Sequence, residues 1–331
     1  MDSILIVGAG AWGTALAVLC ARRGHAVSLW SRSLADEINQ TRTNARHLPG
    51  VNIPESIVVT SDLRANANTG FVIWATPSTA LEQISRRLAE SRTVPGEVIC
   101  ISAVKGIELI NGLRMSEVLC RNFPQHALAV LSGPNHAIEI ARKIPSATVV
   151  GSERPEIAGT VQALLASPEF RVYTSPDVAG IEIGGALKNI FALGAGIGDG
   201  LGLGDNAKAA LVTRALAELV RLGIQLGGRR DTFYGLSGAG DLMVTCFGRH
   251  SRNRRAGELL AKGKSLAEVT EFLGTMPEGI PTTRSVYRLM QKLTLNAPIT
   301  TQVYRVLEEQ AEPSEALRRL LERELRPEAD E

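Results

Sequence analysis

An excess of charge of one sign is absent from this sequence. Thirty-six lysines and arginines stand against 34 aspartates and glutamates, so the formal net charge of the 331 residues is only +2. Nucleic acids and anionic membrane surfaces are bound through strongly basic fields. We therefore expect neither as a partner, and any affinity for phosphate must come from a local site that takes a small molecule.

Cysteine is also scarce, and its spacing carries no metal or redox motif. The four cysteines are Cys20, Cys100, Cys120 and Cys246; no two form a Cys-x-x-Cys pair, and the five histidines form no ligand cluster near them. Zinc sites and redox dithiols need such spacings. We expect no metal site, and free thiols predict a reducing, cytoplasmic location.

Long uncharged runs are few, and the longest apolar one lies near the start. The 18 residues from Ile4 to Ala21 carry no charge, which is the length of a candidate membrane span. No basic residue precedes the run, as a signal peptide would require, and the run contains Gly8, Gly10 and Gly13. A buried strand followed by a buried helix explains it better, so no membrane span is expected.

The length and an apolar content of 44% predict two domains with substantial cores. In the first half, short apolar runs alternate with amphipathic stretches, the pattern of a doubly wound, mostly parallel sheet covered on both faces. Residues 1–182 are predicted to form this α/β domain. The expected strands are Ile4–Val7, Ala26–Trp30, Val58–Thr60, Phe71–Trp74, Val98–Ser102, Ala127–Leu131, Ala147–Val150 and Phe170–Tyr173, and the expected helices include Ala11–Arg23, Thr79–Ala89 and Pro155–Ala166.

Beyond about residue 180 the strand pattern ends, and residues 183–331 are predicted to form an all-α domain. Its first element is a glycine-rich but apolar stretch, interpreted as a tightly packed helix followed by a turn. A charged tail from Glu312 predicts a short helix with frayed last residues. The expected helices before that tail are Gly185–Gly196, Asn206–Leu226, Arg255–Ala261, Leu266–Leu273, Thr282–Leu293 and Ile299–Leu307.

A Gly-x-Gly-x-x-Gly motif follows the first strand and opens the first helix. It reads Gly8-Ala9-Gly10-Ala11-Trp12-Gly13, and its strand–turn–helix setting makes it a strong signal for dinucleotide binding. Gly8 permits the sharp turn, Gly10 lets the backbone approach a pyrophosphate, and Gly13 lets helix pack closely on strand. The free N–H groups of the helix N-terminus then attract the phosphates.

The end of the second strand bears on the choice of cofactor. A carboxylate that holds the adenosine 2′-hydroxyl normally follows this strand, whereas here Ser31-Arg32 follows Trp30 and the first acid is Asp36. A guanidinium at this place attracts a 2′-phosphate. NADP is therefore predicted to be accepted beside NAD, unless Arg32 is only a solvated surface residue.

Three further segments place polar groups where a site would need them. Lys105 lies just past the carboxyl end of a strand, where ligands bind, although a surface lysine is the plain alternative. Lys188 and Asn189 are the only polar side chains from Ile183 to Ile197. Desolvation disfavours the charged form of a lysine in such a helix, which suits proton exchange near neutral pH; a snorkelling lysine is the alternative.

The third segment runs from Gly238 to Asn253. Asp241 lies between glycines and apolar residues, with Thr245 four residues later. Ser251-Arg252-Asn253 then combine a hydroxyl, a guanidinium and an amide, which suit a phosphate monoester. Since Arg249, Arg254 and Arg255 flank this triplet, Arg252 can equally be read as part of a charged helix start.

Taken in order, these motifs resemble the glycerol-3-phosphate dehydrogenases that depend on NAD or NADP, particularly the bacterial biosynthetic branch. The resemblance runs from Ile4 to about Leu307. Its markers are Gly8 to Gly13, Asn44, Leu48-Pro49-Gly50, Ala75-Thr76-Pro77-Ser78, Lys105-Gly106-Ile107-Glu108, Leu131-Ser132-Gly133-Pro134, Ala186-Leu187-Lys188-Asn189, Gly240-Asp241, Ser251-Arg252-Asn253 and Pro277-Glu278-Gly279. Such an ordered set is far more specific than any one motif.

The resemblance implies a role for each matching position. It implies a Rossmann-like domain, a helical domain like that of 6-phosphogluconate dehydrogenases, and Lys188 as the general acid–base. Substrate would be bound by Lys105, Gly133, Asn135, Lys188, Asn189, Asp241, Thr245, Ser251, Arg252 and Asn253. The cofactor, NAD or NADP, would be bound by Gly8, Gly10, Ala11, Trp12, Gly13, Arg32, Lys105, Ala137, Arg252, Met276 and Glu278.

The implied reaction is reversible hydride transfer to the C2 carbonyl of dihydroxyacetone phosphate, giving glycerol 3-phosphate for phospholipid synthesis. The active site would lie between the domains, and the resemblance also implies a homodimer. Many relatives carry a small hydroxyl residue and an aromatic after the Gly-Pro pair, whereas this chain has Asn135 and His136; His136 is interpreted as a helix-start residue. Two alternatives remain open: a 6-phosphogluconate or 3-hydroxyacid type of dehydrogenase, and a non-catalytic dinucleotide sensor.

Overall fold

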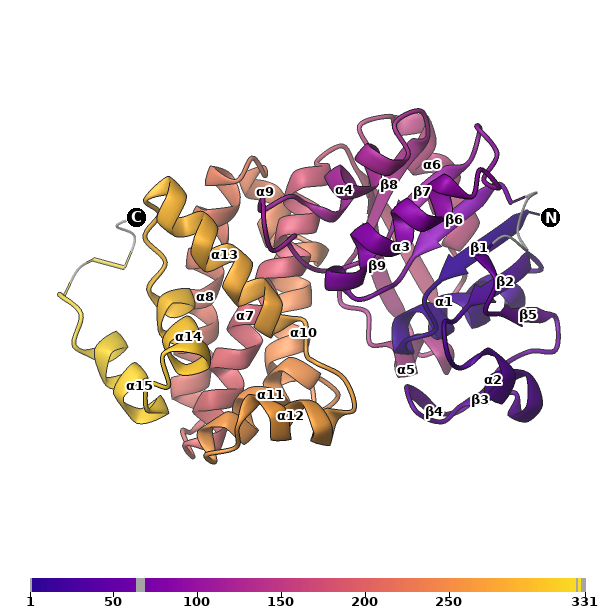
Figure 1. Ribbon diagram of the computed structural model, residues 1–331. Helices are drawn as coiled ribbons and strands as arrows, with labels where there is room; N and C mark the ends of the chain where they lie inside the picture. Colours follow the sequence, from indigo (N-terminus) through magenta and orange to yellow (C-terminus); the bar gives the residue numbers. More distant parts are fainter. Residues whose placement is uncertain (1, 64–68, 326, 329–331) are drawn as a thin grey trace. The chain divides into compact units, whose positions relative to one another are not determined.

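Eight strands form one sheet in the first part of the chain, as a computed structural model shows for residues 2–63, 69–325 and 327–328. The spatial order is β10-β9-β8-β7-β6-β1-β2-β5, and every pairing is parallel except that of β8 with β9. The mostly parallel sheet expected from the sequence is therefore confirmed (Figure 1). The strands are β1 (Ser3–Val7), β2 (Ala26–Trp30), β5 (Ile57–Thr60), β6 (Phe71–Trp74), β7 (Ile99–Ser102), β8 (Ala127–Ser132), β9 (Ser146–Gly151) and β10 (Phe170–Ser175).

Helices cover both faces of this sheet, because alternate residues of its inner strands are apolar on both sides. Ile4 and Ile6 of β1 pack into one cluster, whereas Leu5 and Val7 pack into the other. The first cluster is closed by α1 (Ala11–Arg22), α5 (Ala137–Ala141) and α6 (Pro155–Leu165), and the second by α3 (Ser78–Glu90) and α4 (Met115–Asn122). The uncharged run from Ile4 to Ala21 is thus a buried strand followed by a buried helix, as predicted.

Some elements of this part were not predicted from periodicity. The helix α2 (Ala35–Thr41) and the small antiparallel pair β3 (Thr43–Asn44) and β4 (Leu48–Asn52) follow β2, and α4 was not predicted either, whereas α5 begins where His136 was interpreted as a helix-start residue. All are short, and segments of one or two turns carry too few apolar positions to show a period.

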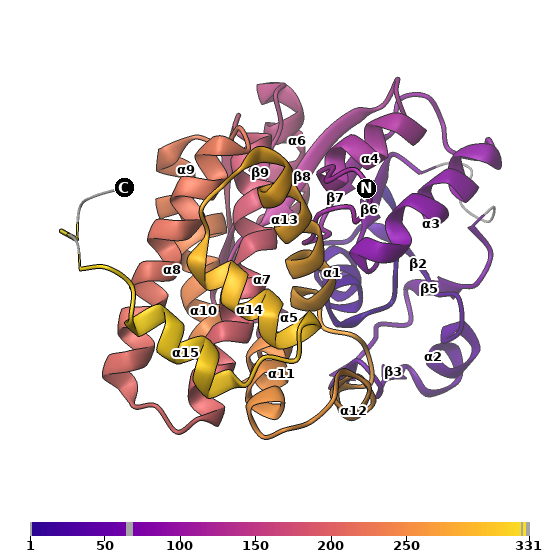
Figure 2. The ribbon, with the colours of Figure 1, turned by 60° about the vertical axis from the view of Figure 1, so that its left-hand side comes forward.

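Helices are the only regular elements among the described residues after β10, which agrees with the predicted all-α domain. They are α7 (Val178–Gly200), α8 (Asp205–Gln225), α9 (Arg230–Tyr234), a π-helical turn η2 (Leu236–Gly240), α10 (Asp241–Phe247), α11 (Arg252–Ala261), α12 (Leu266–Leu273), α13 (Gly279–Leu293), α14 (Pro298–Glu308) and α15 (Pro313–Leu321). Figures 1 and 2 both show α14 beside α15 and α13. The contacts divide the chain into two compact units, one of Met1–Lys105 with Leu113–Glu182 and one of Gly106–Gly112 with Ile183–Glu331.

The helix α7 is longer than the sequence suggested. We expected it to begin at Gly185, but it begins at Val178, where the Asp177 carboxylate accepts the N–H of Gly180 at 2.9 Å and caps it. The glycines after Ile183 do not break the helix because another backbone lies against them: a Cβ at Gly184 would be 2.7 Å from the carbonyl oxygen of Ser237. Length and apolarity make α7 a formal candidate for a membrane span, but 89% of its apolar window is buried within the protein.

Candidate active site

The Gly-x-Gly-x-x-Gly motif, residues Gly8 to Gly13, spans the loop between β1 and α1 and the first turn of α1, and is called the fingerprint below. The structure gives a separate physical reason for each of its glycines. Gly8 has a φ of +117°, and a Cβ there would lie 2.7 Å from the carbonyl oxygen of Ala75. A Cβ at Gly13 would lie 1.9 Å from the carbonyl oxygen of Gly8, so only glycine lets α1 approach the strand. Gly10, by contrast, has no atom within 4 Å of its virtual Cβ among the described residues. That open side is where a ligand can approach the backbone.

The N-terminus of α1 is suited to an anion. Gly10 is the N-cap residue and has no side chain to satisfy the first N–H groups, and the first turn, which begins with Ala11 and Trp12, contains no acidic residue. Partial positive charge at this helix end therefore stays available for phosphate. The sheet order reverses at β1, between β2 and β6, and ligands of doubly wound folds bind outside such a reversal.

Asn44 fixes this loop from outside, a role that the sequence did not reveal. Its amide nitrogen donates to the carbonyl oxygen of Ala9 at 2.8 Å and contacts Thr14 Oγ1 at 2.9 Å. Asn44 is buried and stands on the short strand β3. The only signal for it was its place among the family markers. Arg32 lies exposed after β2, while the neighbouring Ser31 hydroxyl accepts the N–H of Leu34.

The carboxyl ends of β7 and β8 bring Lys105 and Gly133 together. The Lys105 ammonium donates to the carbonyl oxygen of Gly133 at 2.9 Å, and Gly133 has a φ of +149° with Thr148 packed against it. Asn135 Nδ2 donates to the carbonyl oxygen of Ala147 at 3.0 Å, and its Oδ1 lies 3.0 Å from the Thr148 hydroxyl. Asn135 thus joins the loop to β9, so its structural part is to hold the Gly133 turn.

The short helix α5 begins next to that turn. Ala137 is its first residue, and His136 is its N-cap residue. This placement agrees with the interpretation of His136 as a helix-start residue. The helix packs on α1, so the loop that contains Gly133 and the fingerprint helix belong to one packed group.

In the second unit, Lys188 lies in a buried polar cluster with Asp241 and Thr245. The Lys188 ammonium donates to the Asp241 carboxylate and, at 2.8 Å, to Thr245 Oγ1. The Thr245 hydroxyl donates its proton to the backbone oxygen of Asp241 at 2.6 Å. The lone pairs of the hydroxyl oxygen are therefore free to accept from the ammonium. Lys188 is 7% exposed and Asp241 is fully buried.

Close backbone contact between two helical segments makes this cluster possible. Gly184 lies one turn before Lys188 on α7, and Ser237 lies one turn before Asp241 in the η2 turn. The Ser237 carbonyl oxygen would be only 2.7 Å from a Cβ at Gly184. Any larger residue at Gly184 would separate the segments and with them the ammonium from the carboxylate.

A buried ion pair is a poor device for stability alone, since desolvation of the two charges offsets their attraction. Its presence in an otherwise apolar helix therefore favours a functional role for Lys188. From the sequence we expected burial to disfavour the ammonium; the structure places the Asp241 carboxylate against it. The adjacent Cys246 is not a competing reactive group, because burial raises the pKa of its thiol to about 12.

Asn189 and Asn253 join three helices next to this cluster. The N–H of Gly279 donates to Asn253 Oδ1 at 2.9 Å, so the Asn253 amide must turn its Nδ2 toward Asn189, whose Oδ1 accepts at 2.8 Å. Both side chains are buried. The structure thus ties α7, α11 and α13 together at the residues predicted to surround the substrate.

The remaining predicted residues lie around the start of α11 and the loop before α13. Helix α11 begins at Arg252, not at Arg255 as expected, because the Ser251 hydroxyl accepts the N–H of Arg254 at 3.2 Å and caps it. Arg252 is exposed and donates to Thr275 Oγ1 at 2.6 Å. Met276 is exposed in the same loop, and Glu278 is the N-cap residue of α13.

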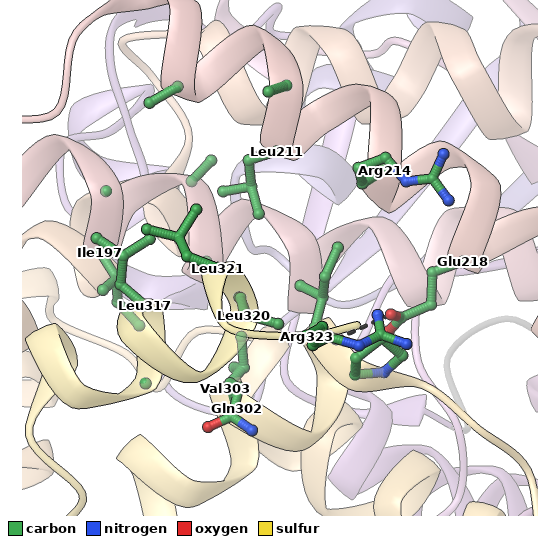
Figure 3. Close-up of a pocket in the computed structure, with 18 of the residues that line it drawn as sticks. Ile197, Leu211, Arg214, Glu218, Gln302, Val303, Leu317, Leu320, Leu321 and Arg323 are labelled. Carbon is green, nitrogen blue, oxygen red and sulfur yellow. Dashed lines mark hydrogen bonds between the residues drawn. The ribbon is translucent and has the colours of Figure 1, made fainter. Parts of the chain in front are cut away.

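The second unit also contains an apolar pocket of about 550 Å³. Figure 3 shows Leu211, Leu317 and Leu320 around it, from α8 and α15. None of the described residues that line it belongs to the predicted site. Glu218, which borders it, is occupied in accepting the N–H groups of Ile299 and Thr300 at the start of α14. A polar reaction needs convergent polar groups, and the leucine side chains of this pocket do not supply them.

Comparison with known proteins matches both halves of the chain to one family. Its two sequence models, described as the N-terminus and the C-terminus of NAD-dependent glycerol-3-phosphate dehydrogenase, match residues 3–158 and 177–318. Curated relatives named glycerol-3-phosphate dehydrogenase (NAD(P)+) include that of Desulfitobacterium hafniense, 43% identical over 100% of this chain and 94% of its own length, and that of Pelotomaculum thermopropionicum, 47% identical over 97% and 93%. A glycerol-3-phosphate dehydrogenase structure from Coxiella burnetii superposes with a TM-score of 0.94 at 37% identity, over 97% of this chain and 99% of that one.

Proposed function

Because the chain belongs to the NAD-dependent glycerol-3-phosphate dehydrogenase family, we propose that it interconverts dihydroxyacetone phosphate and sn-glycerol 3-phosphate with NAD or NADP. The observation that carries the proposal is the buried cluster of Lys188, Asp241 and Thr245. A dinucleotide sensor without catalysis has no use for such a costly ion pair. The triplet Ser251-Arg252-Asn253, which suits a phosphate monoester, favours dihydroxyacetone phosphate over the substrates of 6-phosphogluconate and 3-hydroxyacid dehydrogenases.

The fingerprint loop has the features that a dinucleotide requires. The open side of Gly10 and the uncapped N-terminus of α1 fit a pyrophosphate, and Ala11, Trp12 and Gly13 lie in the first turn of the helix that holds it. Lys105, Ala137, Met276 and Glu278 are proposed as further cofactor contacts. When bound, the reduced nicotinamide supplies a hydride to the carbonyl carbon of the substrate.

Lys188 is the proposed general acid–base. Reduction places negative charge on the substrate oxygen, and the Lys188 ammonium donates a proton to it; in the reverse direction the neutral amine accepts that proton. Asp241 and Thr245 orient the ammonium through their hydrogen bonds. Asn189 and Lys105 are proposed to stabilise the developing charge, and the loop of Gly133 and Asn135 to hold substrate.

Ser251, Arg252 and Asn253 are the proposed phosphate site. Arg252 carries the charge that a phosphate monoester needs, and its exposed side chain is accessible. Binding energy at the phosphate, away from the reacting carbon, helps to orient the carbonyl. Asn253 contributes by holding Asn189 in place.

The proposal is tested by the absorbance of reduced cofactor at 340 nm with purified protein and dihydroxyacetone phosphate. Rapid oxidation of NADPH or NADH is expected, together with little activity on 6-phosphogluconate or 3-hydroxyacids in the reverse assay. Protein that binds the cofactor, but neither oxidises NAD(P)H with dihydroxyacetone phosphate nor reduces NAD(P)+ with the alcohol substrates, would be a sensor, and the proposed reaction would be wrong.

Arg32 is expected to favour NADP. The Arg32→Ala variant should lose about tenfold in kcat/KM with NADPH, because a charge-assisted contact to the 2′-phosphate is removed, and should change little with NADH. The two rates are measured in parallel with the wild type. An equal effect on both cofactors would place Arg32 among ordinary surface residues.

The proposed division of labour assigns dinucleotide binding to residues 1–182 and substrate binding with catalysis to residues 183–331. A cytoplasmic location and a part in supplying phospholipid precursors fit the family. We also propose a homodimer. Light scattering on the purified protein should then give twice the 35.4 kDa of one chain, whereas a mass equal to one chain would contradict it.

A further inference from the structure

Four arginines surround the proposed phosphate site, and the structure separates their roles. Arg252 contacts Thr275, and the exposed Arg255 lies over the ring of Phe272 at 5.3 Å. Arg249 is exposed. Arg254 alone among the four turns inward to a carboxylate, with only 16% of its side chain exposed. The sequence singled out Arg252 but offered no way to tell Arg249, Arg254 and Arg255 apart.

Arg254 holds both ends of the turn that precedes α11. Its guanidinium donates to the Asp199 carboxylate and, through Nε, to the carbonyl oxygen of Gly248 at 3.3 Å. The backbone N–H of Arg254 donates to the Ser251 hydroxyl. The turn from Gly248 to Ser251 is therefore fixed at its first residue by the side chain of Arg254 and at its last residue by the backbone.

The backbone of Arg254 is itself pressed against α7. A Cβ at Gly196 would lie 1.8 Å from the carbonyl oxygen of Arg254, and a Cβ at Gly257 would lie 2.0 Å from that of Leu193. Two glycines thus let α11 rest directly on α7. Asp199 stands one turn after Gly196, so the backbone and the side chain of Arg254 meet the same helix.

Asp199, whose carboxylate accepts from Arg254, also pairs with a second cation. Lys208, at the start of α8, also donates to Asp199 at 2.9 Å and lies over the ring of Phe247 at 5.2 Å. Glu258, one turn along α11, approaches Arg254 at 3.8 Å. The charges facing Arg254 are therefore two carboxylates and one ammonium, all partly buried.

We propose that Arg254 is a positioning residue, which holds the Ser251–Asn253 turn in the geometry that binds the substrate phosphate. The proposal rests on the function proposed above. Arg254 does not need to touch the phosphate, because its guanidinium is engaged by Asp199 and Gly248. A displaced turn would move the Ser251 hydroxyl and the Arg252 guanidinium away from the oxygens that they bind, and small displacements at a binding site are costly.

The test compares Arg254→Gln with Arg255→Gln, a neighbouring arginine on the exposed side of the same helix. In Arg254→Gln, the KM for dihydroxyacetone phosphate is expected to rise about tenfold or more, while kcat stays within about threefold. The KM for reduced cofactor is expected to rise no more than it does in Arg252→Ala, because Arg252 is also implied to contact the cofactor. Arg255→Gln should match the wild type in all three constants. Arg252→Ala provides the loss expected when the phosphate contact itself is removed.

Arg254→Lys guards against a failure of Arg254→Gln to fold. Lysine keeps the charge beside Asp199 but lacks the planar fork that reaches Gly248, so an intermediate KM is expected. An unchanged KM for the phosphorylated substrate in a folded variant would overturn the proposal. So would a loss in which kcat and both KM values change together, since that pattern reports general damage. A wild type that does not reduce dihydroxyacetone phosphate at all would instead refute the proposed function, before any variant is compared.

Discussion

Turnover is expected to fall by about 100-fold or more when Lys188 is replaced by alanine. The ammonium is the proton donor in the proposed reaction, and Asp241 and Thr245 hold it in place. Neither neighbour replaces it, because Thr245 already donates to a backbone oxygen and Asp241 accepts. The measurement is kcat for dihydroxyacetone phosphate across a range of pH.

The same substitution also leaves Asp241 as a buried and uncompensated charge. A loss of roughly 3–5 kcal/mol in the free energy of unfolding is therefore expected for Lys188→Ala, and low activity alone would not separate catalysis from folding. The double variant Lys188→Ala with Asp241→Asn removes the unpaired charge. It should regain much of the stability and none of the turnover. Recovery of turnover in the double variant, or a modest loss with an unaltered pH profile in the single one, would contradict the role of Lys188.

The second large effect concerns two glycines that lie three residues apart. Gly13→Ala should lower the free energy of unfolding by about 3 kcal/mol, since the added methyl would overlap the carbonyl oxygen of Gly8 at 1.9 Å. Helix propensity alone predicts the opposite sign, because alanine is favoured over glycine by about 1 kcal/mol inside a helix. Chemical denaturation of the cofactor-free protein measures the change.

Gly10→Ala is the matched control. Nothing among the described residues lies within 4 Å of its virtual Cβ, and its φ of −72° is open to alanine. Its stability without cofactor should stay within about 0.5 kcal/mol of the wild type, while the dissociation constant for NADPH rises about tenfold or more, because the methyl occupies the side from which a pyrophosphate approaches. Equal effects of the two substitutions on stability would remove the distinction between a packing glycine and a ligand-facing glycine.

The fingerprint illustrates what the sequence predicts well. The positive φ of Gly8, the contact of Gly13 with Gly8 and the open side of Gly10 follow from a few consecutive residues, so they can be predicted from the spacing, whereas the approach of Ala75 to Gly8 cannot. The strands β2 and β6 were predicted to the residue for a similar reason, because each is a short apolar run between polar turns. The start of α7 was not predicted correctly. A cap at Asp177 and the backbone packed on Gly184 compensate for glycines that otherwise weaken a helix.

The sequence by itself determined the α/β class, the helical second part, the fingerprint and the unusual position of Lys188 in an apolar helix. Only the tertiary structure decided that Lys188 meets Asp241, 53 residues away, and that Arg254 turns to Asp199 while Arg252 and Arg255 do not. The physical reason is the same in both cases. Which polar groups meet depends on how closely two helices approach, and glycines such as Gly184 and Gly196 set that approach through contacts with backbone atoms far away in the sequence.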